Sequence, residues 1–307
     1  MSAAPPTGAA SAIEAASLGV APRTRQLLSD YLELTKPKVQ TLLLLTTITT
    51  MYVAGDPSPL LVALTCLGGY LSAGGAGAVN HWYDRDIDAQ MARTANRPVP
   101  SGRVSPRAAL LFGCTLALLS IAELSLTVNP LAAALSFSGF LGYVFVYTVW
   151  LKRRTPQNIV IGGAAGAVPP LVGWAAVTGS VSGTAVILFF IVFFWTPPHF
   201  WALSLLMKNE YAKVKIPMMP VARGEGETRR QILIYSILLY AVTQLPFCAG
   251  GFGTVYLAAS MVLGIGFVYG AVRLYFRADR RSALTLYLFS LAYLALLFAS
   301  MVLDRHV

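Results

Sequence analysis

The chain has 307 residues, of which 56% are hydrophobic and 12% are charged, and its mean hydropathy is +0.64. Apolar runs of about 20 residues recur along it, which is typical of a polytopic membrane protein and excludes a soluble globular enzyme. The formal net charge of +10 would indicate nucleic-acid binding only if it belonged to a soluble basic domain, and the sequence offers none. We therefore expect no nucleic-acid partner.

The first segment, residues 1–27, is predicted to be a disordered cytoplasmic tail, because residues 1–22 are rich in Ala, Ser, Gly and Pro and carry no lysine or arginine. Between Arg25 and Lys38, apolar residues alternate with charged ones. That pattern is consistent with a short interfacial helix leading to Pro37. Residues 28–307 are predicted to form one membrane-embedded domain.

Nine transmembrane helices are predicted, so the expected fold class is an all-α polytopic membrane protein. Proline and glycine inside some of the spans indicate kinked helices. The approximate limits are 38–55, 59–81, 108–127, 130–150, 157–178, 184–206, 231–249, 253–275 and 283–303.

The connections between these spans differ in charge, since 22 of the 23 Lys and Arg residues lie on one side and only Arg305 on the other. The positive-inside rule therefore predicts a cytoplasmic N-terminus and an external C-terminus. We expect a bacterial inner membrane, with the mitochondrial inner membrane as the alternative. Two long cytoplasmic loops, 82–107 and 207–230, are expected to carry the chemistry and could close over a shared cavity.

The first of these loops begins with an acidic motif, Asn80-His-Trp-Tyr-Asp84-Arg-Asp86-Ile-Asp88. If the preceding helix continues, Asn80, Asp84 and Asp88 advance about 40° per step beyond a full turn and form one oxygen-rich stripe. Such oxygens suit Mg²⁺ that also binds substrate phosphates. Asp86 falls off the stripe and is excluded from the site; Arg85 beside it could hold it in a surface ion pair.

Two arginines, Arg93 and Arg97, follow the stripe at a spacing of four residues. Arginine binds phosphate oxygens through planar, bidentate donors, so stripe and arginines together fit a Mg²⁺-diphosphate. The alternative is an acidic helix end that is merely solvated at the membrane surface and paired with nearby arginines.

The segment NHWYDRDIDAQMARTANRP resembles the first aspartate-rich motif of the UbiA superfamily of intramembrane prenyltransferases, in which Asn80, Asp84 and Asp88 match residue by residue. Within it, the DRDID core and the RTxxRP continuation resemble the protohaem IX farnesyltransferases, or haem O synthases. Four more segments support the narrower resemblance: LTKPKVQTLLLLTT (35–48), YTVWLKRRTPQNIVIGGAAGAVPPLVGWAAVTG (147–179), WTPPHFWALSL (195–205) and KIPMMPVARG (215–224). The resemblance implies a UbiA-type bundle.

The resemblance also implies further site residues. In the loop after the fourth span it favours Lys152 and Asn158 as diphosphate-binding residues, with Tyr147 as a donor to a leaving oxygen; the alternative is a basic cluster that only sets topology. After the sixth span, many relatives carry a second DxxxD, whereas this chain has only Glu210, followed by Tyr211. Glu210 could reach Mg²⁺, or Lys208 and Lys215 could contact diphosphate directly; a solvated helix is the alternative.

His199 is the one histidine in the middle of an apolar region, and it is flanked by Pro197-Pro198 and by aromatic residues. A neutral imidazole can ligate haem iron, and the aromatic side chains would suit a porphyrin. We predict a haem contact here. The alternative is a histidine that hydrogen-bonds a carbonyl left free by the two prolines.

The implied activity is transfer of farnesyl from farnesyl diphosphate to a vinyl group of protohaem IX with addition of water, which gives haem O. The implied cofactor is Mg²⁺, with haem B a substrate, and haem A synthase or oxidase assembly proteins are candidate partners. Two alternatives remain. One is a related prenyltransferase acting on a quinone precursor, which should retain a second DxxxD; the other is a transporter, which should carry acids near the bilayer midplane.

Overall fold

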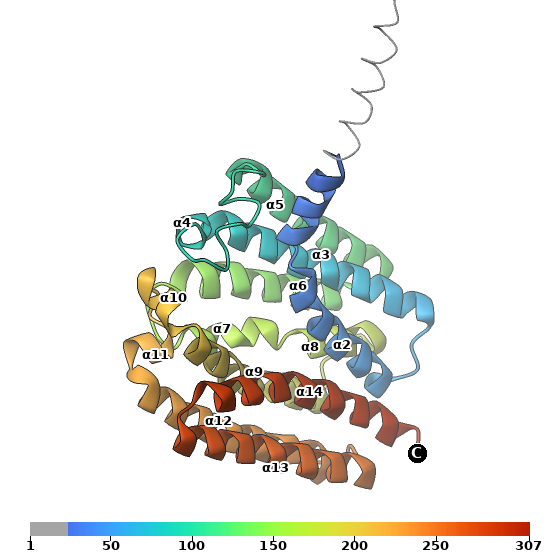
Figure 1. Cartoon of the computed structure of the whole chain (residues 1–307). Helices are drawn as coiled ribbons and strands as arrows, with labels where there is room; N and C mark the ends of the chain where they lie inside the picture. The colour runs from blue at the N-terminus through green and yellow to red at the C-terminus, as the bar shows by residue number, and fades with distance from the viewer. Residues whose placement is uncertain (1–23) are drawn as a thin grey trace, which may run out of the picture.

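The computed structural model describes residues 24–307, and all regular structure in that range is helical (Figure 1). After a helix over residues 24–34, the long uninterrupted helices are α2 (Pro37–Ala54), α3 (Pro59–Tyr83), α5 (Pro106–Thr127), α9 (Gly183–Leu206), α12 (Gly224–Cys248), α13 (Thr254–Arg277) and α14 (Arg280–Arg305). Two further spans are each built from two pieces: α6 (Pro130–Leu141) with the π-helix η1 (Gly142–Leu151), and α7 (Asn158–Gly166) with α8 (Pro169–Thr178). Three short helices lie in loops: α4 (Arg85–Asp88), α10 (Lys208–Lys213) and α11 (Met219–Ala222).

Several helices begin at a capping side chain followed by proline. Ser58 accepts a hydrogen bond from the Leu61 N–H before α3, and Asn129 accepts one from the Ala132 N–H before α6. Each cap satisfies an N–H that lacks a partner within the helix, and a proline at the first helical position loses no hydrogen bond. The sequence therefore specifies where these spans start.

The number of spans differs from the prediction. Eight helices in the described residues are long and apolar enough to cross a membrane, and α2 is not among them, so the count of nine is not confirmed. Helix α2 has 18 residues, and threonines lower its hydropathy. Thr46 and Thr49 donate to carbonyl groups of the preceding turn, at 2.8 and 2.7 Å, so these buried hydroxyls are satisfied within the helix.

Two predicted boundaries are wrong. Residues 24–27 are helical and not part of a disordered tail, while residues 1–23 of that predicted tail lie outside the described residues. Helix α12 begins at Gly224 and not near residue 231, because its first two turns are charged and extend the helix beyond its apolar part. Hydropathy alone detects only the apolar part.

Close contact between α3 and α5 fixes the end of α3 on which the acidic motif begins. A Cβ atom at Gly113 would lie 2.7 Å from Val79 Cγ2 and 2.8 Å from the carbonyl oxygen of Gly75. Only glycine allows the two backbones to approach this closely, as small residues do in membrane helix pairs. Val79 immediately precedes Asn80, so this packing sets the position of the first residue of the stripe.

The two long loops meet at one end of the bundle. Figure 1 places α4, α10 and α11 at one end and the C-terminus at the other. The backbone N–H of Ala92 donates to the Glu210 carboxylate at 2.9 Å, which joins residues 118 positions apart in the chain. The loops 82–107 and 207–230 thus contact each other, and a cavity shared between them stays a prediction.

Candidate active site

The acidic stripe continues across the joint between α3 and α4. Helix α3 ends at Tyr83, yet the Asp84 N–H donates to the Asn80 carbonyl at 2.9 Å and the Asp88 N–H to the Asp84 carbonyl at 2.8 Å. The helical repeat therefore persists, and all three side chains face the protein interior, with 3%, 0% and 4% of Asn80, Asp84 and Asp88 exposed. The spacing in the sequence predicted this arrangement.

Each oxygen-bearing side chain of the stripe accepts a hydrogen bond from a cation that belongs to a different segment. The pairs are Lys36 Nζ with Asn80 Oδ1 (2.5 Å), Lys152 Nζ with Asp84 Oδ2, and Arg97 Nη1 with Asp88 Oδ2 (2.6 Å). Two carboxylates thus stand among these three cations, and Arg153 Nη2 also lies 3.5 Å from Asp84 Oδ1. We call the six residues of the three pairs the stripe–cation cluster.

The Asn80 amide is oriented by its own hydrogen bonds. Its Nδ2 donates to Asp84 Oδ2 at 2.7 Å and to Thr148 Oγ1 at 3.2 Å, which leaves Oδ1 for Lys36. Thr148 belongs to η1 and is fully buried. The first residue of the stripe is therefore held from three sides.

The π-helix η1 supplies two tyrosines to the same region. Tyr143 OH accepts a hydrogen bond from Lys36 at 3.4 Å, and the rings of Tyr143 and Tyr147 lie 5.4 Å apart. Gly162 of α7 makes room for Tyr147, since a Cβ there would lie 2.5 Å from the Tyr147 ring. π-Helical turns often occur at functional sites. Tyr147 was predicted from the sequence, whereas Tyr143 was not.

Lys36 is a second residue that sequence reasoning missed, although it lies within the LTKPKVQ segment. Burial, with Arg97 and Lys152 nearby, lowers the pKa of Lys36 from its usual range to about 7. The signal that could have identified it is a lysine directly before the proline that opens an apolar span. Many such lysines only mark the membrane boundary, so the signal is weak.

Asp86 lies outside the cluster, as predicted, but its expected partner was wrong. Arg153 donates to both of its carboxylate oxygens at 2.7 Å, and these hydrogen bonds lower the pKa of Asp86. Arg85 instead donates to the Trp82 carbonyl at 2.6 Å. The partner differs from the prediction because the loop after η1 brings Arg153 against Asp86, a contact that sequence neighbours do not reveal.

Asn158, predicted to bind diphosphate, is fully buried and braces the loop before α7. Its Nδ2 donates to the Thr155 carbonyl at 2.7 Å and to the Lys152 carbonyl at 3.4 Å. In this arrangement it holds the backbone that carries Lys152. A direct contact with diphosphate stays a prediction.

The predicted residues of α10 and the nearby loops have partners outside the cluster. Lys208 pairs with Glu225 at 3.0 Å, Lys215 is exposed, and Tyr211 is half-buried among apolar side chains. Glu210 accepts from Lys213 at 3.1 Å as well as from the Ala92 N–H, and these hydrogen bonds lower its pKa. Arg93 is exposed near Glu210. Their roles at diphosphate remain predictions.

His199 is buried in α9 with 6% of its surface exposed. Its Nδ1 lies 2.6 Å from Ser290 Oγ, and its ring stacks between Trp195 and Tyr287, with centroids 4.2 and 5.0 Å away. The flanking aromatic residues thus cover the imidazole itself. A haem contact by His199 stays a prediction.

The stripe fits a metal ion that is also bound by substrate oxygens better than a metal ion held by protein ligands alone. Over residues 24–307, no three His, Cys, Asp or Glu side chains gather so that they could hold a metal by themselves. Asn80, Asp84 and Asp88 offer one amide and two carboxylate groups, the oxygen ligands Mg²⁺ takes while it keeps waters and phosphate oxygens. The donor set fits Mg²⁺ that is bound together with a phosphate-bearing molecule.

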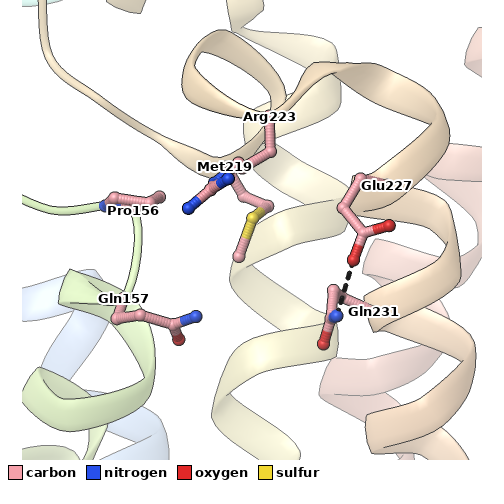
Figure 2. A pocket seen from close by; sticks show the side chains of 6 residues that line it. All are labelled: Pro156, Gln157, Met219, Arg223, Glu227 and Gln231. Carbon is pink, nitrogen blue, oxygen red and sulfur yellow. Dashed lines mark hydrogen bonds between the residues drawn. The ribbon is translucent and has the colours of Figure 1, made fainter.

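A separate polar cleft of about 490 Å³ opens beyond the loop that carries Lys152. In Figure 2, Gln157 and Arg223 extend into it from two sides, Met219 lies between them, and Glu227 accepts a hydrogen bond from Gln231 at 2.7 Å. The cleft could accept an anionic group at Arg223. None of the stripe residues lines it.

The fold is shared with solved membrane proteins. A structure described as a digeranylgeranylglyceryl phosphate synthase in membranes matches with a TM-score of 0.75 at 20% identity, over 91% of this chain and 98% of that one. A UbiA homologue from Archaeoglobus fulgidus, bound to DMAPP and Mg²⁺, matches with a TM-score of 0.63 at 17% identity, over 89% and 99% of the two chains. The chain is a helical membrane protein with this fold.

Residues 43–298 match the model of the UbiA prenyltransferase family, and the chain belongs to this family. It is 54% identical to a protoheme IX farnesyltransferase of Chloroflexus aurantiacus over 92% of its length, but spans about half (49%) of that relative. Proteins of the same name from Saccharophagus degradans and Symbiobacterium thermophilum are 50% and 52% identical over 91% of this chain and 92% and 95% of their own lengths.

The pairing of Asp84 with Lys152 should appear as energetic coupling in a double-mutant cycle. Lys152→Met leaves a buried carboxylate short of a partner, and Asp84→Asn leaves an unpaired ammonium, so each single variant should be less stable. We expect the double variant to recover about 1–3 kcal/mol relative to additivity. Unfolding in detergent micelles measures this.

The matched control is the same cycle on the exposed pair Lys208–Glu225, using Lys208→Met and Glu225→Gln, for which we expect about 0–1 kcal/mol. Additive single effects at Asp84 and Lys152 would show that the ion pair does not hold the site together.

Proposed function

We propose that this protein transfers the farnesyl group of farnesyl diphosphate to a vinyl group of protohaem IX, with addition of water, to give haem O and diphosphate. Support comes from the relatives named protoheme IX farnesyltransferase, two of which it covers almost completely. The observation that carries the proposal is the stripe–cation cluster, in which Asp84 and Lys152 lie within one buried site.

The chemistry requires a site that stabilises departing negative charge. The C–O bond of farnesyl diphosphate breaks, and both of its electrons leave with diphosphate. The vinyl π electrons then bond to the allylic carbon, and water adds to the resulting cation and loses a proton. No covalent nucleophile from the protein is needed; the protein's part is preorganised positive charge and exclusion of water until the carbon–carbon bond has formed.

The cluster's own residues supply these functions. Lys152 and Arg97 are donors that can bind diphosphate oxygens, and Asn80, Asp84 and Asp88 are the residues that would hold Mg²⁺. When bound, Mg²⁺ would supply further neutralisation of the charge that develops on diphosphate. Tyr147, next to Tyr143 in η1, is proposed to donate to a leaving oxygen.

Proposals on setting and partners rest on charge distribution and family. We infer a bacterial inner membrane, an N-terminus in the cytoplasm and an external C-terminus, because Lys and Arg concentrate on one side. Haem A synthase or oxidase assembly proteins are proposed partners, because they would use haem O.

The competing proposal is a family member that prenylates a quinone precursor. In this chain the region after α9 has Glu210 as the sole carboxylate of the second motif, and Glu210 is engaged with Ala92 and Lys213. That departure favours the haem acceptor. The two proposals share the diphosphate site and differ only in the acceptor.

The product of the reaction tests the acceptor. Purified protein in detergent, incubated with protohaem IX, farnesyl diphosphate and Mg²⁺, should yield haem heavier by one hydroxyfarnesyl addition, detected by mass analysis of extracted haem. Chelation of Mg²⁺ should abolish this product. Unmodified haem together with a prenylated quinone precursor would refute the acceptor and leave the diphosphate site standing.

Asp84 and Asp86 lie two residues apart, and their substitution should affect turnover very differently. Asp84→Asn should lower turnover by about 100-fold or more, because it removes a central charge from the site. Asp86→Asn should remain within a few-fold of the original rate, since Asp86 has 57% of its side chain exposed and its partner Arg153 lies 2.7 Å from it but 3.5 Å from Asp84. Initial rates of haem O formation measure both, and retention of more than about a third of the rate by Asp84→Asn would exclude its proposed role.

A further inference from the structure

Lys36 has an unusual backbone. Its φ and ψ of 54° and 57° are left-handed, a conformation that is strained for a residue other than glycine. Strain of this kind persists only where the surroundings hold it. Here Gln40 Nε2 donates to the Thr35 carbonyl at 2.6 Å, and Thr35 Oγ1 lies 2.9 Å from Tyr70 OH.

Helix α3 lets this segment lie directly on its surface. A Cβ at Gly77 would lie 2.9 Å from the Leu34 carbonyl oxygen and 3.6 Å from Lys36 Cδ. Gly77 therefore leaves the space through which the Lys36 side chain runs into the bundle, where it reaches Asn80 and Tyr143. Lys38, two residues further on, is exposed.

The partners of Lys36 leave its charge incompletely matched. Within the described residues, Lys152 has Asp84 and Arg97 has Asp88 as salt-bridge partners, whereas Lys36 bonds only to an amide oxygen and a phenol. A half-buried cation among other cations is costly without an anion of its own. An anion added close to Lys36 would therefore balance a positive charge that has no salt-bridge partner in the cluster.

We propose that Lys36 is a diphosphate-binding residue, supplied by the segment before α2 and aimed at the stripe by its left-handed backbone. The inference rests on the proposed function, because diphosphate is the anion which that reaction brings to the cluster. It adds to Lys152 and Arg97 a third donor, from a part of the chain outside both long loops. A cation already held in place loses little entropy when the anion arrives.

Titration of inorganic diphosphate with Mg²⁺ into the detergent-solubilised full chain, followed by calorimetry, tests this without turnover. Lys36→Gln should weaken binding about 10-fold or more, as loss of a charge-assisted hydrogen bond does. Lys38→Gln, the matched control, should stay within about 2-fold, and Lys36→Arg should recover part of the loss. The thermal midpoint of each variant in detergent identifies any that fails to fold.

The outcomes separate the two proposals. If the wild-type chain binds diphosphate and Lys36→Gln binds it with the same affinity, the role of Lys36 is overturned and the proposed function stands. An absence of diphosphate binding by the wild-type chain would overturn the diphosphate site and with it the proposed function. If Lys36→Gln does not fold, Lys36→Arg takes its place. A diphosphate affinity of Lys36→Arg below that of Lys38→Gln supports the proposal. An affinity equal to that of Lys38→Gln in every folded Lys36 variant overturns it.

Discussion

The arrangement of this molecule depends on the compensation of buried negative charge. Two carboxylates of the stripe, Asp84 and Asp88, are almost inaccessible to solvent, and a buried carboxylate is tolerated only with a cation or other strong donors beside it. The cations that pair with them come from the loop after α4 (Arg97) and from the loop after η1 (Lys152). One electrostatic requirement thus ties together parts of the chain up to 68 positions apart.

Packing and hydrogen bonds hold the site at one end of the bundle. Glycine contacts between α3 and α5 fix Asn80, η1 brings Thr148 to its amide, and Asn158 braces the loop that carries Lys152. The Glu210 carboxylate then joins the second long loop to the first. Rigid helices therefore carry the acids, and loops carry most of the cations, which suits a site whose cations have to exchange partners when substrate binds.

Features that depend on neighbouring residues in the chain could be predicted from the sequence, and features that depend on tertiary contacts could not. Most spans and the stripe of Asn80, Asp84 and Asp88 follow from hydropathy and helical period, which depend only on neighbours in the chain. The partner of Asp86, the bracing role of Asn158 and the reach of Lys36 depend on tertiary contacts and on one left-handed residue, for which no periodic signal exists. The spacing of the arginines predicted Arg97 as a phosphate donor and the family resemblance predicted Lys152, but neither predicted that each also neutralises one carboxylate.

The chain's own cations occupy the oxygens that a metal would use, so metal and diphosphate should bind together. The most direct test is the affinity for Mn²⁺, measured by its paramagnetic resonance with and without saturating inorganic diphosphate and corrected by a protein-free titration. We expect an affinity for Mn²⁺ at least about 10-fold higher with diphosphate, and an equal effect of the metal on the affinity for diphosphate. Tight Mn²⁺ binding by the protein alone, unchanged by diphosphate, would contradict it.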